Sequence, residues 1–370
     1  MRARLGPAFA MIVACACVEP APKHATPPAP SSSAAPEAAA RRIPTPGVTQ
    51  QVMEIDADAT RGTLVIATSD RALVIIRGGV QRSWPMKELM DAGSCGLKSD
   101  AMLGYLRIGV SADGAQAWFL GMDGSKRPPI RTLSAACLVD TQSGAARSLS
   151  AELGNPSHLD PVRVEADGLA SIALGPKLAV LWGGRSELEA VWRVSRRIDR
   201  LITGERDGAC AVVEAGNELV VGCVASREQG RVTLLRFDIA ASPPKPITRH
   251  EIQLRAKFPE IQMSADGRFL GFYQPMVSAD AASFMGVIDT GDGHVAFERE
   301  ARPPVRAMEF VGGADALLVA QDNGPLRLLR VDGHPEGRFG FNCTPRRLLA
   351  QTGSRRLWCA GYSALGLYKY

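Results

Sequence analysis

Residues 108–121 read IGVSADGAQAWFLG, and residues 261–274 read IQMSADGRFLGFYQ. Both stretches place Ser-Ala-Asp-Gly between two apolar segments. Asp-Gly in this setting is a strong signal for a β-hairpin, because glycine accepts the positive φ of a tight hairpin turn. The chain therefore holds two clear copies of one hairpin, which predicts a repeated, all-β architecture.

Weaker copies of this hairpin run along the rest of the chain. They are MEIDADATRGTLVIAT, VRVEADGLASIAL, AVVEAGNELVVGC, MEFVGGADALLVA and LLAQTGSRRLWCA. The predicted turn glycines lie about 40 to 54 residues apart, at Gly62, Gly114, Gly168, Gly216, Gly267, Gly313 and Gly353. A second hairpin signal follows in CLVDTQSGAARSL and GVIDTGDGHVAFE, and more loosely in LLRFDIAASPPKPITRHEI and LLRVDGHPEGRFG. Two hairpins per period indicate four-stranded units.

This period, with its Ser-Ala-Asp-Gly hairpins, resembles the WD40-like and YVTN-type β-propellers over residues 49–370. The Gly-His and Trp-Asp signatures of true WD40 repeats are absent. The resemblance implies an all-β propeller of four-stranded blades, and seven turn glycines imply seven blades. The C-terminal LGLYKY would be the third strand of the last blade, so we expect Ile43–Gln51 to add its fourth strand and close the ring. A pair of β-sandwiches is the alternative architecture.

The N-terminus has the pattern of an export signal. Residues 1–14 form a short basic and apolar leader, and Ile12-Val13-Ala14-Cys15 resembles the lipobox of bacterial lipoproteins. The resemblance implies cleavage before Cys15 and a lipid on its thiol, with Cys17 as the second choice. It also implies an outer-membrane anchor, because no acidic residue follows the cysteine. A plain secretory signal is the alternative interpretation.

Residues 15–48 combine the candidate lipidated cysteine with a tether rich in Pro, Ala and Ser. Such a composition cannot bury enough apolar surface to fold, so we expect a disordered linker. The predicted domains are thus a signal peptide (1–14), a tether (15–48) and a propeller (49–370). The expected location is the bacterial cell envelope, on either the periplasmic or the outer surface.

Six cysteines remain in the predicted propeller, and an even number in an exported chain suggests disulfides. Cys210 and Cys223 would face each other across the hairpin CAVVEAGNELVVGC, and Cys343 with Cys359 spans a second candidate hairpin. Buried free thiols are the alternative for each pair. The spacing does not assign Cys95 and Cys137.

Catalytic motifs are missing from the sequence, which has no G-x-S-x-G elbow and no H-x-x-H or H-E-x-x-H pattern. The histidines of the predicted propeller lie near turn residues and are expected in solvent; they are His158, His250, His294 and His334. Asp289 and Asp292 are interpreted as capping their own turn rather than binding calcium. We therefore expect no cofactor and no metal.

Two features of the sequence bear on partners. The net charge of +5 comes from scattered arginines, without a basic block that would indicate nucleic-acid binding. Long insertions are expected in loops, which often carry function. The candidate interaction residues in these loops are Lys87, Asp91, Lys98, Lys126 and Arg127.

The predicted function is that of a membrane-tethered binding module or scaffold of the envelope, which recognises a macromolecular partner through loops on one face. A role like that of the lipoprotein propellers that assist outer-membrane protein assembly is one form of this prediction. The alternative is a lactonase-like or hydrolase-like enzyme with a site in the central channel. Glutamates near the ends of innermost strands would then line the site, at Glu54, Glu165, Glu214 and Glu309.

Overall fold

The structure is a computed structural model. The structure describes residues 38–39, 41–43, 51–58, 62–96, 103–123, 133–159, 171–182, 187–202, 209–225, 230–275, 283–311, 315–321, 324–340, 343, 345–351, 355–361 and 365–370. Met1–Pro36 forms a unit separate from Glu37–Tyr370. All the elements below belong to the second unit.

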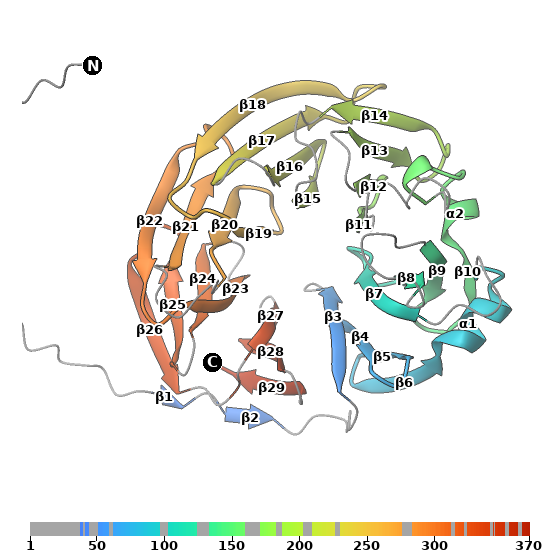
Figure 1. The fold of residues 1–370 in the computed structure, drawn as a ribbon, viewed down its shortest axis with the longest axis horizontal. Coiled ribbons are helices and arrows are strands. Elements are labelled where there is room, and N and C mark those ends of the chain that lie inside the picture. Colours follow the sequence, from blue (N-terminus) through green and yellow to red (C-terminus); the bar gives the residue numbers. More distant parts are fainter. Residues whose placement is uncertain are drawn as a thin grey trace, which may run out of the picture. The chain divides into compact units, whose positions relative to one another are not determined.

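Seven antiparallel sheets, the blades, are arranged in a ring around a common centre (Figure 1). Blade 1 contains β3 (Val52–Asp58), β4 (Thr63–Thr68), β5 (Ala72–Arg77) and β6 (Val80–Pro85). Blade 2 contains β7 (Leu103–Val110), β8 (Gln116–Asp123), β9 (Leu133–Asp140) and β10 (Ala146–Ser148). Blade 3 contains β11 (Ser171–Leu174), β12 (Leu178–Trp182), β13 (Glu187–Trp192) and β14 (Ile198–Ile202).

The remaining blades repeat this order. Blade 4 contains β15 (Cys210–Ala215), β16 (Glu218–Val224), β17 (Arg231–Asp238) and β18 (Lys245–Gln253). Blade 5 contains β19 (Glu260–Met263), β20 (Phe269–Tyr273), β21 (Ser283–Asp289) and β22 (Val295–Ala301). Blade 6 contains β23 (Val305–Val311), β24 (Ala316–Gln321), β25 (Leu326–Arg330) and β26 (Pro335–Gly340). Blade 7 contains β27 (Pro345–Gln351), β28 (Arg356–Gly361) and β29 (Leu365–Lys369).

The ring is closed by a strand from the N-terminal part of the chain. Strand β2 (Arg41–Ile43) pairs antiparallel with β29 as the fourth strand of blade 7, and β1 (Ala38–Ala39) pairs parallel with β26. The predicted closure is therefore present, but it uses Arg41–Ile43 rather than Ile43–Gln51. Both strands lie within residues 15–48, so the ring begins before the predicted boundary. Their pairing depends on partners in the last two blades rather than on any apolar pattern of their own.

The Ser-Ala-Asp-Gly turns have the same hydrogen bonds in blades 2 and 5. Ser111 Oγ donates to Asp113 Oδ1 at 2.6 Å, and Ser264 Oγ donates to Asp266 Oδ1 at 2.7 Å. The glycine that follows has a φ of 65° in blade 2 and 72° in blade 5, a backbone conformation that other residues adopt at a cost. The predicted Asp-Gly hairpins thus form as the sequence indicates.

One predicted turn is wrong. Gly168 was assigned to the inner hairpin of blade 3, but β11 begins only at Ser171 and its turn lies at residues 175–177. The Glu214 carboxylate of blade 4 accepts hydrogen bonds from the backbone N–H groups of Lys177 and Leu178. A neighbouring blade therefore stabilises this turn, which lacks the Asp-Gly sequence of the inner hairpins in blades 2 and 5.

Apolar side chains fill the spaces between blades. Seven clusters of buried residues occur in the described chain, and each lies at one of the seven blade interfaces. Successive side chains of a strand point to opposite faces of its sheet, and each blade packs against a neighbour on both faces. Apolar residues therefore occupy both faces of each blade. Within the described residues no helix is long and apolar enough to cross a bilayer.

Three disulfides link the described residues. Cys210–Cys223 joins opposite residues of β15 and β16, and Cys343–Cys359 joins the segment before β27 to β28, so both pairs agree with the sequence interpretation. The third disulfide is Cys95–Cys137. It ties the segment after helix α1 (Met86–Ala92) to β9, where the Ala136 N–H also donates to the Cys95 carbonyl at 3.1 Å. This helix packs against the outer strands of blades 1 and 2 (Figure 1).

The two faces of the ring carry different connections. Because strands alternate in direction within a blade, the turns between first and second strands and between third and fourth strands leave from one face, the hairpin face. Connections between second and third strands, and between blades, leave from the opposite face, the long-connection face. Three long insertions of the sequence, MKELMDAGSCGLKSDAMLG (86–104), GMDGSKRPP (121–129) and QPMVSADAAS (274–283), fall at connections between strand ends on the long-connection face.

Candidate functional site

The innermost strands of four blades share a β-bulge near their first residue. The register shifts between Val52 and Glu54, between Leu103 and Tyr105, between Val305 and Ala307, and between Pro345 and Arg347. A bulge turns the side chains beside it and often occurs next to functional sites. Glu54 and Arg347 therefore hold equivalent positions in blades 1 and 7, near the long-connection face where their strands begin.

Arg347 is at the centre of a charged group on these strands. Its guanidinium lies 3.3 Å from the Glu54 carboxylate and 4.0 Å from that of Asp56. Arg107 of β7 approaches the same Glu54 carboxylate at 3.7 Å, and the Val110 N–H donates to Asp56 at 3.0 Å. Charges from blades 7, 1 and 2 are thus joined by direct contacts. About half of the Arg347 side chain remains exposed (48%), so a ligand can reach it.

Glu309 of β23 extends this group into blade 6. Gln262 of β19 donates a hydrogen bond from Nε2 to Glu309 Oε2. Burial raises the pKa of Glu309 to about 7, although this bond and the charge of Arg347 act in the opposite direction. Glu309 is therefore close to half protonated at neutral pH. We call Glu54, Asp56, Arg107, Gln262, Glu309 and Arg347 the inner-strand cluster.

Burial and neighbouring charges also shift the pKa of Asp56 and of Arg347. The Asp56 side chain is 27% exposed, but desolvation by the surrounding protein still raises the pKa of Asp56. The positive charge of Arg347 lowers this pKa and so offsets only part of the rise. Burial alone would lower the pKa of Arg347, but Asp56 and Glu54 raise it above its usual value, so the arginine stays charged. Tyr273, which is not a member of the cluster, donates a hydrogen bond from its hydroxyl group to the Glu260 carboxylate. Burial is the larger cause of the raised pKa of Tyr273, and the charge of Glu260 is the second.

The predicted glutamates do not all meet. Glu54 and Glu309 both face Arg347, as a site at the inner strands requires. Glu214 instead binds the turn of blade 3, and Glu165 lies outside the described residues. Arg347, Arg107 and Asp56 were not identified from the sequence. In the sequence, each of these residues is marked only as a charged residue within an otherwise apolar innermost strand. This pattern identifies a site only once the register of the strands is known.

The predicted loop and lipid residues are placed only in part. Lys87 and Asp91 are exposed on helix α1 at the outer rim of blades 1 and 2, away from the innermost strands. Lys98, Lys126 and Arg127 lie outside the described residues, as do Cys15 and Cys17.

Solvent exposure was predicted for all four histidines, but this prediction is wrong for two of them. His158 is buried, and Glu189 accepts a hydrogen bond from its N–H at 2.9 Å. His250 lies in β18, half-buried beside Gly293, because the outer hairpin of blade 5 packs onto blade 4. His294 and His334 lie at turns, as predicted.

The outer hairpin of blade 5 brings together three residues of types that bind cations. They are Asp289, Asp292 and His294, whose ligand atoms lie within 4.8 Å of one another. Asp289 Oδ1 accepts the Gly291 N–H at 2.8 Å, and Asp292 Oδ1 accepts the His294 N–H at 3.0 Å. Both carboxylates thus cap the turn, as the sequence interpretation states.

Comparisons with known proteins bear on the fold. No family model matches the chain, and no curated protein matches it. Solved structures do match, including the β-propeller domain of Cps50 (Swd1) from Myceliophteria thermophila, with a TM-score of 0.57 and 12% identity over 90% of this chain and 99% of that one. The fold is that of a seven-bladed β-propeller.

Hydrazine synthase from Kuenenia stuttgartiensis is a second match, with a TM-score of 0.56 and 12% identity over 88% of this chain and 97% of that one. At such identity the likeness concerns the fold alone. One of these two proteins is named as an enzyme and the other as a propeller domain, so the fold does not decide between catalysis and binding.

Proposed function

We propose that this propeller is a binding module of the bacterial cell envelope, tethered through Cys15, which recognises a macromolecular partner at its long-connection face. The inner-strand cluster carries this proposal. It presents two arginines and several carboxylates on four bulged innermost strands, and the side chains of Arg107 (41%) and Arg347 (48%) remain exposed to a partner. Such a fixed pattern of both signs favours a partner of complementary charge and disfavours others.

Exposed apolar side chains on the same face support a protein partner. Met53, the bulge residue of β3, is 45% exposed, and Phe258, just before β19, is 46% exposed. Apolar contacts combined with a charged centre are typical of protein interfaces. The tether would keep the ring close to the membrane and raise its effective concentration there.

Site-specific photocrosslinking in the intact envelope tests the proposed binding face. A photoreactive residue at Met53 or at Phe258 is expected to give one shared crosslinked product. Ile247 on outer strand β18 is the matched control, because it is equally exposed (49%) but lies on the rim. Arg107→Glu should remove the product at both test positions. Equal products from Ile247, or none from any position, would contradict the proposed face.

Intact-mass measurement tests the anchor separately. The membrane fraction should contain a chain that begins at Cys15 and carries acyl mass, and Cys15→Ala should abolish that mass. A chain cleaved elsewhere and without acyl mass would make the protein a freely exported propeller.

A second candidate function, hydrolysis at the inner strands, is favoured by the raised pKa of Glu309. A carboxyl group with a pKa of about 7 can act as a general acid or base at neutral pH. Screening lactone and ester substrates with the natural protein and with Glu309→Gln tests this candidate. Turnover that disappears in Glu309→Gln would support it, and absence of turnover in both would reject it for those substrates.

A further inference from the structure

The outer hairpins of blades 2, 3 and 5 have one common backbone conformation. We number the six residues of each hairpin 1 to 6, starting at Asp140, Trp192 or Asp289. The carbonyl of residue 1 accepts a hydrogen bond from the N–H of residue 5. The N–H of residue 1 donates to the carbonyl of residue 6. These bonds join Asp140 with Gly144 and Ala145, Asp289 with Gly293 and His294, and Trp192 with Arg196 and Arg197. The residue at the fifth position has a positive φ in all three hairpins, 77°, 76° and 57° respectively.

Blade 3 keeps this conformation without the residues that favour it. Blades 2 and 5 have Asp-Thr at the first two positions and glycine at the fifth. Blade 3 has Trp192 and Arg193 at the first two positions, and Arg196 at the fifth. A non-glycine residue with positive φ is strained, and such strain persists only where other contacts hold it.

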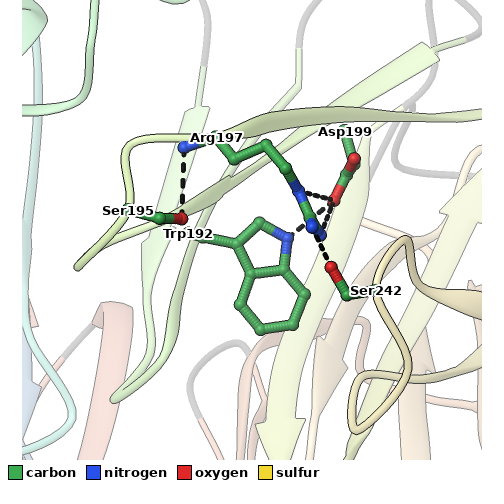
Figure 2. Close-up of polar contacts among 5 residues, drawn as sticks. All are labelled: Trp192, Ser195, Arg197, Asp199 and Ser242. Atoms are coloured by element: carbon green, nitrogen blue, oxygen red, sulfur yellow. Dashed lines mark hydrogen bonds and ion pairs between the residues drawn. The ribbon is translucent and has the colours of Figure 1, made fainter.

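Contacts around Trp192 hold the hairpin in place (Figure 2). The Trp192 indole N–H donates to Asp199 at 2.6 Å, and the Arg197 guanidinium donates to the same carboxylate at 2.6 and 3.1 Å. Arg197 also stacks on the Trp192 ring, 5.0 Å from its centre, and donates to Ser242 of blade 4. The hairpin is therefore a rigid projection braced by two blades.

The tip of this hairpin combines one apolar side chain with several cations. Val194 is 98% exposed, the highest value among the large apolar side chains of the described residues. Arg193, Arg196 and Arg197 surround it in the sequence, and we call Arg193–Arg197 the blade-3 tip. Arg193 is fixed by the Gly175 carbonyl at 2.9 Å and by Gln116 at 2.5 Å. Within the described residues, Asp199 on β14 pairs with Arg197, and no ion pair involves Arg193 or Arg196.

We propose that the blade-3 tip docks the propeller onto an anionic lipid bilayer, with Val194 entering the interface and the exposed Arg196 binding lipid phosphates. An apolar side chain with flanking cations has the complementary charge and polarity for such a surface. A projecting tip of five residues offers much less than the roughly 1,000 Å² that a stable protein interface buries. A bilayer needs no matching concave surface, and the tip lies on the hairpin face, so the long-connection face would point away from the lipid.

Hydrogen–deuterium exchange on the full chain tests this proposal locally, independently of any anchor. Cys15→Ser and Cys17→Ser are present throughout, so that no acyl chain can be attached. Vesicles of roughly three parts phosphatidylethanolamine to one part phosphatidylglycerol should slow exchange in residues 193–197, because anionic lipid attracts the arginines. Phosphatidylcholine vesicles should not. Equal protection by both lipids, or none by either, would overturn the proposal.

Two variants measure the contributions of the cation and of the apolar side chain by vesicle co-sedimentation. Arg196→Gly should weaken partitioning about 5-fold, as expected for one cation near an anionic surface. This variant keeps the hairpin, because glycine occupies the equivalent position in blades 2 and 5. Val194→Ser should weaken partitioning about 10-fold through lost apolar burial.

Val80→Ser is the matched control for Val194→Ser. Val80 is also exposed at an outer hairpin, on the same face in blade 1, but Gly78 and Gly79 form its turn. It should partition like the parent protein, and a loss equal to that of Val194→Ser would overturn the proposal. Soluble polyglutamate is the final comparison. Protection of the tip by polyglutamate but not by anionic vesicles would assign the tip to an acidic polypeptide and reject the lipid surface.

Discussion

Glu309→Gln is expected to stabilise the protein in a strongly pH-dependent way. The half-buried carboxyl group of Glu309 has a pKa of about 7 in the fold, against an ordinary value of 4.5. The folded protein therefore binds more protons at this position than the unfolded chain does between these two values. Stability is lost as the pH rises through this window, because folding then opposes the ionisation of Glu309.

The size of the effect follows from the two pKa values. One pKa unit corresponds to about 1.4 kcal/mol, so moving from 4.5 to about 7 costs the wild-type protein about 3 kcal/mol at pH 8. Glutamine removes this cost, because it stays neutral and its carbonyl still accepts the bond from Gln262. The variant should match the wild type near pH 4.5 and unfold about 4 °C higher at pH 8.

Thermal unfolding followed by circular dichroism at several pH values between 4.5 and 8 measures this difference. Glu251→Gln is the control, because Glu251 is exposed on β18 and its hydrogen bond with Arg249 lowers its pKa. That control should show no gain as the pH rises. The reasoning is refuted if Glu309→Gln shifts the melting temperature equally at all pH values, or lowers it at pH 8.

Three further changes probe the turns and the disulfide of the ring. Arg196→Gly should raise the unfolding free energy by about 0.5–1 kcal/mol in chemical denaturation, because relief of the positive φ exceeds the entropy that glycine adds to the unfolded chain. Gly144→Ala should lower the melting temperature instead, because its φ is 77° and an added Cβ would lie 2.4 Å from the Trp84 ring. The paired change Cys95→Ala and Cys137→Ala should cost about 4 kcal/mol, from the 42-residue separation that the disulfide closes. Chemical denaturation of this variant and of the parent protein, both without reductant, measures the cost, and an unchanged midpoint would contradict it.

Much of the architecture was predictable because hairpins are local. Asp-Gly turns mark the inner hairpins of blades 2 and 5, and other glycine-containing turns between apolar segments recur at a similar spacing that indicates seven blades of four strands. The same local argument pairs Cys210 with Cys223. The inner hairpin of blade 3 was misplaced because Asp167-Gly168 carries the local signal, whereas the turn between β11 and β12 is stabilised by the Glu214 carboxylate of another blade. The closing strand was misplaced for a related reason, since Arg41–Ile43 takes its hydrogen bonds from β29.

The inner-strand cluster, by contrast, exists only in the closed ring. Arg347 and Glu54 are 293 residues apart in the sequence, and they meet because blade 7 closes against blade 1. Two of the predicted glutamates, Glu54 and Glu309, belong to this cluster, but their common partner Arg347 carries no motif of its own. Turn chemistry and strand alternation depend on neighbouring residues and are therefore determined by the sequence alone. Contacts between innermost strands depend on register, bulges and ring closure, and only the tertiary structure decides which charges face one another.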